Sequence, residues 1–535
     1  MRKLLLIDTN TLCSTVLDEQ STMKLNIALS VLSLIESCLS ANILAIFTFP
    51  GLSHYRMFQP LLKELAKRDH NVDVYSHFPL KEPINGFTDI SIKGTSPIVT
   101  NNMTVGLLRS ISGSAFTMVM AGPLGAEICR NSFKSDQFIN LKKTTKQYDV
   151  IITELFGTDC MLGWAWYFGV PSIVMTSSAN LPWASERFGL PDNPSYVPNY
   201  FMEYLSIMSL YERIVNTWTL IQSKLLYHIF STWPSNVMAK EFFGEELPDL
   251  DVLAQNTSLQ FVNTHISINN ARALVPNVIE VAGLHIKKSH QINEYFNKIL
   301  TTDKKGVIYF SMGSVLVIET LPEEKLQVLL DTFAELPYKI LVKGSKERFS
   351  KDIKIPENVH LEPWMPQQDI LCDSRVKLFV SHGGMMGTQE AIYCGVPVLG
   401  IPIFADQSLN IKYAETVGYA IMVDYEDISK ERLLGAARKL LEDPRYAANA
   451  KQISEDYKDR PLSPMETAVY WVEYVIRHKG APRLSSAAKY LKWYQYYLLD
   501  VFVIIIGIPL VILFVIIKFV RFYKKFTDEK IKKTL

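Results

Sequence analysis

Residues 364–410 carry, in one short run, side chains suited to the parts of a nucleoside diphosphate sugar. Trp364 offers a flat face for a base, and Gln367 offers a donor and an acceptor for the edge of that base. His382 can donate a hydrogen bond to a diphosphate oxygen. The carboxylate of Glu390 can accept both hydroxyls of a ribose. This combination favours a nucleotide-sugar site.

Two further pairs of residues extend the site. Asp406 and Gln407 can bond several sugar hydroxyls. Gly384 and Gly387 belong to the glycine-rich loop that follows His382, where backbone amides can hold the phosphates. Base, ribose, phosphate and sugar are thus each given a partner within fewer than fifty residues.

The elements that must position these side chains can be predicted from the pattern. Residues 377–380 are a short apolar run that ends at a Ser-His-Gly-Gly turn, and residues 388–393 have helical composition. Gly395 is suited to end that helix, and residues 396–401 form a second buried strand. The result is a parallel βαβ unit. Its loop directs N–H groups and the positive end of the helix dipole at the ligand, and phosphate fits that position.

Taken together, W-M-P-Q-Q-D-I-L, H-G-G-M-M-G-T-Q-E-A and F-A-D-Q resemble the signature of the UDP-glycosyltransferases, a membrane-bound family that conjugates small lipophilic molecules with sugar. The H-G-G-x-x-x-T-Q-E-A form resembles the insect branch. The resemblance implies an α/β fold of the GT-B type, with two Rossmann-like domains facing across a cleft. It also implies a UDP-sugar co-substrate and inversion at the anomeric carbon.

A histidine follows the first predicted strand of the body. Residues 43–49 form that strand, a Pro-Gly turn ends it, and His54 lies before a helix at about residues 57–67. His54 is therefore at the carboxyl end of a strand, where open α/β sheets bind ligands. The run F-P-G-L-S-H-Y-R-M-F-Q-P-L resembles the family segment that holds the catalytic base. A neutral imidazole can take the proton of an acceptor hydroxyl as the new bond forms.

The imidazole needs a carboxylate to fix its tautomer and to stabilise the imidazolium. By resemblance this partner follows the strand at residues 150–153, where the vertebrate branch has Asp and this chain has Glu154. Asp159, on the same loop, is a second candidate. Position favours Glu154, although its longer side chain must fold back to reach the ring.

The second half of the chain opens with a strand at residues 306–310 that runs into S-M-G-S. Ser311, Gly313 and Ser314 form another small-residue loop that can approach the diphosphate. Lys343, at the end of the next strand, lies where the resemblance places a basic residue near the nucleotide.

The predicted organisation has two domains, because 535 residues exceed what one core organises. Its parts are an acceptor-binding domain at 42–275, a UDP-sugar-binding domain at 276–480, a juxtamembrane segment at 481–497, a transmembrane helix at 498–518 and a basic tail at 519–535. By resemblance, an amphipathic helix at 466–478 crosses back to the first domain.

The C-terminus favours a membrane anchor. Residues 501–517 are uninterrupted apolar residues, long enough with their flanks to cross a bilayer. Seven Lys and Arg residues follow, against Asp528 and Glu529 only, which places the tail in the cytosol and the body in the lumen. The terminal Lys-Lys-Thr-Leu resembles a retrieval signal of endoplasmic-reticulum proteins. The prediction is a single-pass type I protein of that membrane.

The N-terminus suggests a secretory signal that begins at Met23 and covers residues 23–41. Residues 1–22, with three acidic side chains, are interpreted as a doubtful extension. In a lumenal body, Asn102 and Asn256 would be glycosylation acceptors. Four cysteines lie beyond the leader without metal-like spacing, so a disulfide is allowed but its pairing is not determined: Cys129, Cys160, Cys372 and Cys394.

Composition restricts the partners. A net charge of +1 provides no electrostatic footprint for nucleic acid, and 48% hydrophobic residues suffice for two cores. The expected partners are a UDP-sugar donor, a small lipophilic hydroxyl acceptor and a lipid bilayer, with a homo- or hetero-oligomer left open. No metal or other cofactor is expected, because Asp249-Leu-Asp251 follows Leu-Pro instead of an apolar strand and is predicted to cap a helix.

Two departures from the family bear on activity. Met386 stands where the vertebrate branch has Asn, and Gly387 stands where insect relatives commonly have Ser. Asn263 aligns with an Arg that glucuronate-using enzymes place near the sugar carboxylate, which favours glucose. Transfer of glucose to lipophilic hydroxyl compounds, as in detoxification or conjugation of endogenous compounds, is the leading hypothesis. A catalytically impaired relative that binds a lipophilic ligand or partner, and a hydrolytic or epimerising enzyme, are the alternatives.

Overall fold

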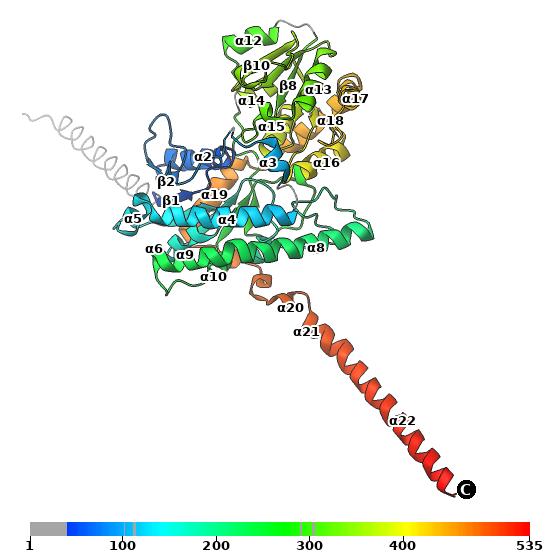
Figure 1. Ribbon diagram of the computed structural model, residues 1–535. Coiled ribbons are helices and arrows are strands. Elements are labelled where there is room, and N and C mark those ends of the chain that lie inside the picture. Colours follow the sequence, from blue (N-terminus) through cyan, green and yellow to red (C-terminus); the bar gives the residue numbers. More distant parts are fainter. Residues whose placement is uncertain (1–39, 101, 111–113, 289–290, 302–304, 535) are drawn as a thin grey trace, which may run out of the picture.

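The computed structural model describes residues 40–534, apart from 101, 111–113, 289–290 and 302–304. The predicted extension and nearly all of the predicted signal peptide lie outside the described residues. Figure 1 shows two α/β lobes, one above the other, with a long C-terminal helix leaving the lower lobe.

The first lobe is built on a seven-stranded parallel sheet in the order β3-β2-β1-β4-β5-β6-β7. Its central strands are mostly apolar and buried because helices cover both faces, whereas the edge strand β3 is more polar and partly exposed. The strands are β1 (Asn42–Phe47), β2 (Asn71–Ser76), β3 (Phe87–Ser91), β4 (Val150–Glu154), β5 (Ser172–Thr176), β6 (Leu259–Val262) and β7 (Val278–Glu280).

The second lobe has a six-stranded parallel sheet in the order β10-β9-β8-β11-β12-β13. The strands are β8 (Val307–Ser311), β9 (Lys339–Lys343), β10 (Val359–Glu362), β11 (Val376–Ser381), β12 (Val398–Gly400) and β13 (Ala420–Met422). In both sheets the strand order reverses once, between β1 and β4 and between β8 and β11. Open α/β sheets bind ligands at the carboxyl ends of the strands that flank such a reversal.

The predicted domain boundary at 275/276 is too early. β7 pairs with β6 and so belongs to the first sheet, and the chain enters the second lobe only after Glu280. The reason is that a short apolar strand has the same pattern whether it ends one sheet or begins the next.

Helices cover both faces of the first sheet. One face packs on α2 (Leu52–Lys67) and α19 (Pro464–His478). The other packs on a helical layer that contains α4 (Ser114–Lys134), α5 (Asp136–Lys142), α6 (Gly163–Phe168), α7 (Ser185–Phe188), α8 (Leu210–Tyr227), α9 (Trp233–Phe243) and α10 (Leu250–Gln255).

Helices also cover both faces of the second sheet. α13 (Glu323–Ala334) and α17 (Lys430–Glu442) lie on one face. The other face carries α12 (Glu294–Thr301), α14 (Gln367–Leu371), α15 (Met385–Cys394), α16 (Gln407–Val417) and α18 (Pro444–Lys458). The short α11 (Ile266–Asn269) lies beside α16 and α18, at the junction of the lobes.

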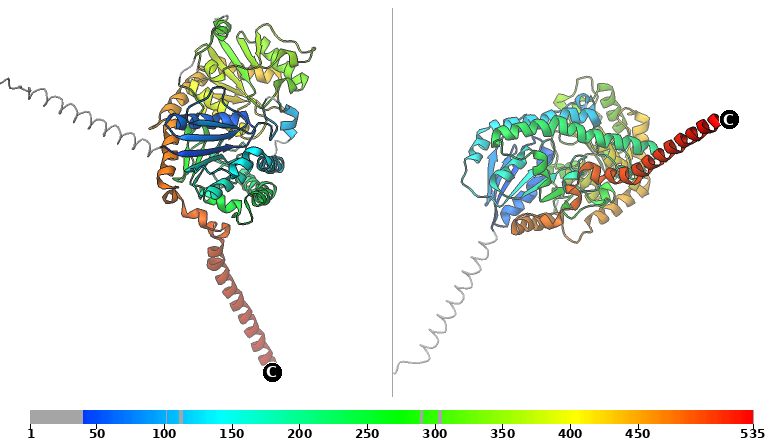
Figure 2. Two further views of the ribbon diagram at one scale, coloured as in Figure 1. Left: turned by 90° about the vertical axis from the view of Figure 1, so that its left-hand side faces the viewer. Right: turned by 90° about the horizontal axis from the view of Figure 1, so that it is seen from below.

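The two lobes exchange elements. α19 follows the second sheet in sequence but buries Ala468, Val469 and Val472 against the first, as predicted for residues 466–478. In the other direction, α3 (Val105–Ser110) of the first lobe buries Val105 in the core of the second. Figure 2 shows α19 lying along the first lobe. Because of both exchanges, the two lobes that form the walls of the cleft are held in position relative to each other.

The C-terminal segment runs through α20 (Trp493–Tyr496), α21 (Leu499–Phe502) and a π turn at Val503–Gly507 into α22 (Ile508–Thr534). Over Leu499–Lys532 the chain forms one helix that is long and apolar enough to cross a membrane, with a mean hydropathy of 3.1 over its most apolar 18 residues. This helix agrees with the predicted span at 498–518, and it continues through most of the basic tail.

Candidate active site

A cavity of about 1190 Å³ lies between the lobes, at the carboxyl ends of both sheets. Both lobes contribute to its walls. Of the predicted catalytic and UDP-sugar residues, those that line it are His54, Ser311, Gly313, Ser314, Lys343, Trp364, Gln367, His382, Gly384, Gly387, Glu390, Asp406 and Gln407. Glu154 and Asp159 do not line it, because both lie behind the wall.

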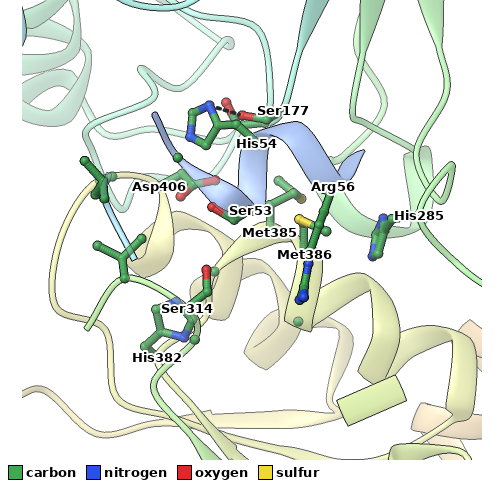
Figure 3. Close-up of a pocket in the computed structure, with 18 of the residues that line it drawn as sticks. Ser53, His54, Arg56, Ser177, His285, Ser314, His382, Met385, Met386 and Asp406 are labelled. Atoms are coloured by element: carbon green, nitrogen blue, oxygen red, sulfur yellow. Dashed lines mark hydrogen bonds between the residues drawn. The ribbon is translucent and has the colours of Figure 1, made fainter. Parts of the chain in front are cut away.

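His54 and Glu154 form a hydrogen-bonded pair. Nδ1 of His54 lies 2.5 Å from Oε1 of Glu154, the last residue of β4, and 3.0 Å from Oγ of Ser177, just after β5. The Glu154 side chain is 5% exposed and the His54 side chain 19% exposed. With Nδ1 engaged on the inner side, Nε2 is the nitrogen left to face the cavity (Figure 3). This is the arrangement that a general base requires.

α2 begins at Leu52, several residues before the predicted start at about 57, so His54 lies in its first turn. The N-cap is Gly51, which makes no side-chain capping bond. The sequence therefore lacks the Ser, Thr or Asp that usually marks a helix start. The helix holds His54 against β4 and leaves Arg56, two residues on, to reach across the cleft.

Asp159 has a different role from Glu154. Its two carboxylate oxygens accept hydrogen bonds from Arg187 at 2.6 and 2.5 Å, and Tyr227 donates a third at 2.9 Å. All three residues are buried. Because this carboxylate is fully engaged by its own partners, Glu154 is the acidic residue at His54.

His382 is held between two glycines of the phosphate loops. A Cβ at Gly313 or at Gly384 would lie 2.6 Å from the imidazole ring, so only glycine fits on either side. Burial, with a further contribution from Lys343, lowers the pKa of His382 to about 4. The ring is therefore neutral at pH 7 and can donate one hydrogen bond.

The phosphate end of the site carries further donors. α15 begins beside His382, with Gly384 as its N-cap residue, and directs its first amides at the cavity. Lys343 donates to the carbonyl of Gly313, and burial followed by the charge of Arg56 lowers its pKa to about 8. It remains largely protonated at pH 7, so the loops and this ammonium together suit a diphosphate.

Trp364 presents its ring to the cavity and is 44% exposed. Two cations lie over that ring: Cζ of Arg56 at 4.5 Å from the centroid and Nζ of Lys343 at 5.0 Å. Figure 3 shows Arg56 extending from α2 toward α15. An exposed indole with cations beside it is suited to stacking a base close to negative phosphates.

Gln367 and Glu390 are joined directly. Nε2 of Gln367 donates to Oε2 of Glu390 at 2.7 Å, and Tyr309 donates to Oε1 of Gln367 at 3.3 Å. Nε2 of the buried His285 lies 3.8 Å from Oε1 of Glu390. Burial raises the pKa of Glu390 to about 7. A hydroxyl that donates to this carboxylate would stabilise its charged form.

Asp406 and Gln407 lie on the wall opposite His54. Burial raises the pKa of Asp406 to about 6. The side-chain oxygen of Gln407 accepts hydrogen bonds from the amides of Ile403 and Phe404, at 2.8 and 3.0 Å. Only the amide nitrogen of Gln407 is therefore left for a ligand, so the pair offers one acceptor and one donor to a sugar.

The cavity beyond His54 is apolar. Phe49 and Phe156 pack against the imidazole with ring centroids 4.5 and 4.7 Å away. Leu181, Trp183 and Phe201 extend this wall. A ligand at this end would meet carbon surface on most sides, with the His54 ring as its polar neighbour.

Asn263 does not lie where the resemblance suggested. It is fully buried outside the cavity wall, donates to the carbonyl of Ser177 at 2.7 Å, and accepts from Gln389 at 2.9 Å. It therefore holds the two lobes together and does not face a sugar. Alignment with the Arg of glucuronate-using enzymes did not predict the surroundings of Asn263, because the direction of this side chain depends on its contact with α15.

Other predicted positions can also be placed. Asp249 is the N-cap residue of α10, as predicted, but its carboxylate accepts from Asn236 and Lys240 instead of from the helix. Asn102 and Asn256 are exposed. The four cysteines in the described part of the chain form two disulfides, Cys129–Cys160 and Cys372–Cys394.

Sequence reasoning missed Ser177, Arg56 and His285. Ser177 follows a strand of the first sheet, and the position of its strand end was a usable signal. Arg56 is two residues from His54 and carries no pattern that points across a cleft. His285 follows the Ala-Gly-Leu that leads into the second lobe, and nothing local distinguishes it from a core histidine.

The two Rossmann-like sheets and the cavity between them define the GT-B class of glycosyltransferases. The glycosyltransferase VinC, solved in complex with dTDP, has a TM-score of 0.54 to this chain at 16% identity and covers 82% of this chain and 100% of its own. The glycotransferase of kitacinnamycin gives a TM-score of 0.54 at 17% identity, covering 81% and 98%. These similarities show the fold.

The family follows from sequence. Residues 96–534 match the family described as "UDP-glucoronosyl and UDP-glucosyl transferase". The chain is 38% identical to UDP-glucosyltransferase 2 of Dactylopius coccus, over 86% of this chain and 89% of the relative. It is 30% identical to UDP-glucuronosyltransferase 1A9 of Homo sapiens, over 75% and 74%. The chain belongs to the UDP-glycosyltransferase family and is a glycosyltransferase.

Proposed function

We propose that the protein transfers a hexose, glucose, from a UDP-sugar to a hydroxyl of a small lipophilic acceptor, with inversion at the anomeric carbon. The observation that carries this proposal is the position of the His54–Glu154 pair. It stands between an apolar chamber on one side and the Asp406–Gln407 pair on the other.

In this mechanism Nε2 of His54 takes the proton of the acceptor hydroxyl while the oxygen attacks the anomeric carbon. The bond from that carbon to the UDP oxygen breaks on the opposite face, so the configuration inverts. The carboxylate of Glu154 stabilises the imidazolium that forms. Charge on the departing UDP is met by the α15 amides, Lys343 and the His382 ring. We propose that no metal takes part.

Glucose is favoured by the charge at the sugar end. Asp406 would repel a sugar carboxylate, and the cations Arg56 and Lys343 lie over the Trp364 ring, on the nucleotide side of the site. A glucuronate carboxylate would have to lose water near Asp406 without a partner cation there, which is costly. Neutral hydroxyls, in contrast, suit one acceptor and one donor.

The apolar chamber suits a lipophilic acceptor such as a phenol, because its walls offer carbon surface and few competing polar groups. This supports a role in conjugation of foreign or endogenous lipophilic compounds.

We further propose that the helix at Leu499–Lys532 anchors the body in the endoplasmic-reticulum membrane, with the body in the lumen. Two disulfides suit an oxidising compartment, and the basic tail suits the cytosolic side. In this orientation the exposed Asn102 and Asn256 would be accessible for glycosylation.

Membranes that contain the full chain, assayed for UDP release from UDP-glucose with and without a phenolic acceptor, test the proposed activity. Release that requires the acceptor, with slower turnover of UDP-glucuronate, supports it. UDP binding without release would favour the impaired relative. Acceptor-independent release would favour hydrolysis, and faster use of UDP-glucuronate would overturn the assignment of glucose.

A further inference from the structure

A row of exposed apolar side chains runs along α8, a π turn at His228–Thr232 and α9. These elements follow one another without a break and form one helical rod. We call the row the apolar stripe; its members are Tyr211, Ile214, Trp218, Ile221, Leu225, Ile229, Trp233 and Val237. Trp218 is 60% exposed and Trp233 66%, and Ile207, in the bend just before α8, is 96% exposed.

The spacing of the stripe places its members on one face. Successive members are three or four residues apart, which is the repeat of one side of a helix. From Leu225 onward the spacing is four throughout, which would drift around a regular α-helix. The π turn takes up an extra residue at this point, so the stripe stays in line. Over about thirty residues the rod is about 45 Å long.

The opposite face of the rod is already occupied. Asn216, Leu220 and Tyr227 are buried, and α8 packs against α4 on this side. The stripe is thus a second apolar face that the body of the protein leaves uncovered. On a protein domain that is surrounded by water, an exposed apolar surface of this extent marks an interaction site.

The position of the C-terminal helix identifies what covers the stripe. Figure 1 shows α8 along the lower edge of the body and α20 to α22 leaving from that edge. Seen from below, in Figure 2, α8 and α22 both lie on the side toward the viewer. A bilayer that is crossed by α22 must therefore lie next to the side of the body that carries α8.

The segment that leads into α22 is fixed to the body and is aromatic. Nζ of Lys489 donates to the carbonyl of Gln255, after α10, at 3.0 Å, which ties this segment to the helical layer that holds α8. Tyr490, Trp493 and Tyr494 then follow with exposed rings. Trp and Tyr rings are typical of the interface between hydrocarbon and headgroups. The stripe and these rings together form one surface of the kind that lies on a membrane.

We propose that the apolar stripe lies in the headgroup region of the bilayer that α22 crosses, so that the body rests on the membrane through α8 and α9. The partner is a lipid surface. One consequence rests on the proposed function: Tyr227, on the inner face of α8, lines the cavity, so the acceptor chamber lies directly behind the lipid contact.

The test uses the full chain in phosphatidylcholine vesicles, with a protease site inserted between Leu491 and Lys492, which are both exposed. Cleavage separates the body from the anchor, and sedimentation measures how much of the body stays with the vesicles. We expect most of the wild-type body to stay. In a stripe variant with Ile214→Gln, Trp218→Gln, Ile221→Gln and Leu225→Gln, lipid partitioning should fall at least about tenfold.

The matched control replaces four exposed apolar residues away from the stripe: Leu274→Gln, Tyr295→Gln, Leu462→Gln and Tyr470→Gln. This variant should stay bound like the wild type. Release of the wild-type body as readily as that of the stripe variant would overturn the proposal. A released body that is a dimer, and becomes a monomer in the stripe variant, would assign the stripe to a second copy instead and would also overturn it.

A second measurement covers the case in which the stripe variant does not fold. A single Ile221→Cys or Tyr295→Cys, each in a chain with Cys13 and Cys38 changed to Ser, is labelled with an environment-sensitive fluorophore. Lipids with a quencher near the headgroup should quench the label at 221 several-fold more than the label at 295. Equal quenching would contradict lipid contact. Neither measurement depends on transferase activity, so the proposed function can fail while this inference stands.

Discussion

Nδ1 of His54 lies 2.5 Å from Oε1 of Glu154, although 100 residues separate them in the chain. The contact exists because β1 and β4 are neighbours in the sheet: Glu154 is the last residue of β4, and His54 lies in the first turn of α2, which follows β1. The longer side chain of Glu154, compared with Asp, reaches the ring directly from the last position of the strand. From this contact, Glu154 orients the catalytic base in the proposed mechanism.

Replacing Glu154 with Gln should lower kcat by about 10² to 10⁴, because the imidazole loses both its fixed tautomer and the charge that stabilises its protonated form. The KM for UDP-glucose should change little, since Glu154 lies outside the cavity wall. Steady-state kinetics of purified full-length enzyme measure both quantities. An unchanged kcat in this variant would show that Glu154 takes no part in the mechanism.

Asp159→Asn should instead destabilise the fold. The change leaves the buried Arg187 guanidinium without its carboxylate, and breaking a buried pair costs about 3–5 kcal/mol. Urea or thermal unfolding of the purified protein measures this loss. Glu154→Gln is the control and should unfold close to the wild type. If Asp159→Asn lost activity at unchanged stability, Asp159 would have to act in the chemistry.

Trp364→Ala should weaken UDP binding by about 1–3 kcal/mol, the usual contribution of a base stacked on an aromatic ring. Trp364→Phe should recover much of it. Calorimetric titration with UDP gives the affinities, and Tyr295→Ala, at an exposed aromatic outside the cavity, is a control that should bind like the wild type. Equal affinity of Trp364→Ala and wild type would place the base elsewhere.

Binding of UDP-glucose should weaken as the pH falls through 7. Burial raises the pKa of Glu390 to about 7, and only the ionised carboxylate accepts from both ribose hydroxyls. Because the charged form is the one that binds, loss of this charge alone should raise the Kd about tenfold from pH 8 to pH 6. Lys343, whose pKa is about 8, gains its charge over the same interval and opposes the rise, so the net increase should be about fivefold. The diphosphate diester does not titrate in this range, and Asp406, with a pKa of about 6, adds its effect mainly below it.

In Glu390→Gln the affinity should be lower, and the increase of Kd on going from pH 8 to pH 6 should be lost, because the remaining titration of Lys343 changes the affinity only about twofold and in the opposite direction. A wild-type Kd that stays constant over this interval would mean that Glu390 is ionised throughout, or that the ribose does not contact it. Titrations at several pH values in one buffer system decide between these results.

The nucleotide-sugar wall could be predicted from sequence because it is local. His382 and Glu390 belong to the loop and helix that follow β11, and Trp364 lies in the loop just before α14, so the spacing along a short segment sets their arrangement. The partner of His54 could only be narrowed to two carboxylates. Choosing between them required the positions of Arg187 and Tyr227, which donate hydrogen bonds to Asp159 from helices of the helical layer.

Contacts between side chains across the cleft could not be predicted from the sequence. Arg56 reaches Trp364 from the other lobe, and Asn263 turns toward Gln389 instead of a sugar. The sheet to which residues 278–280 belong was equally undetermined, since strand pairing is set by tertiary contacts. The two disulfides also depend on distances that spacing does not contain.

The central claim is that His54 is the base of an inverting transfer. A single-turnover reaction of the enzyme with UDP-α-glucose and a phenolic acceptor, with the product examined by NMR, tests it most directly. The account predicts a β-glucoside, and a rate that falls at least about 10²-fold in His54→Ala while the Kd for UDP-glucose stays within about twofold. An α-glucoside, or a His54→Ala rate close to that of the wild type, would contradict it.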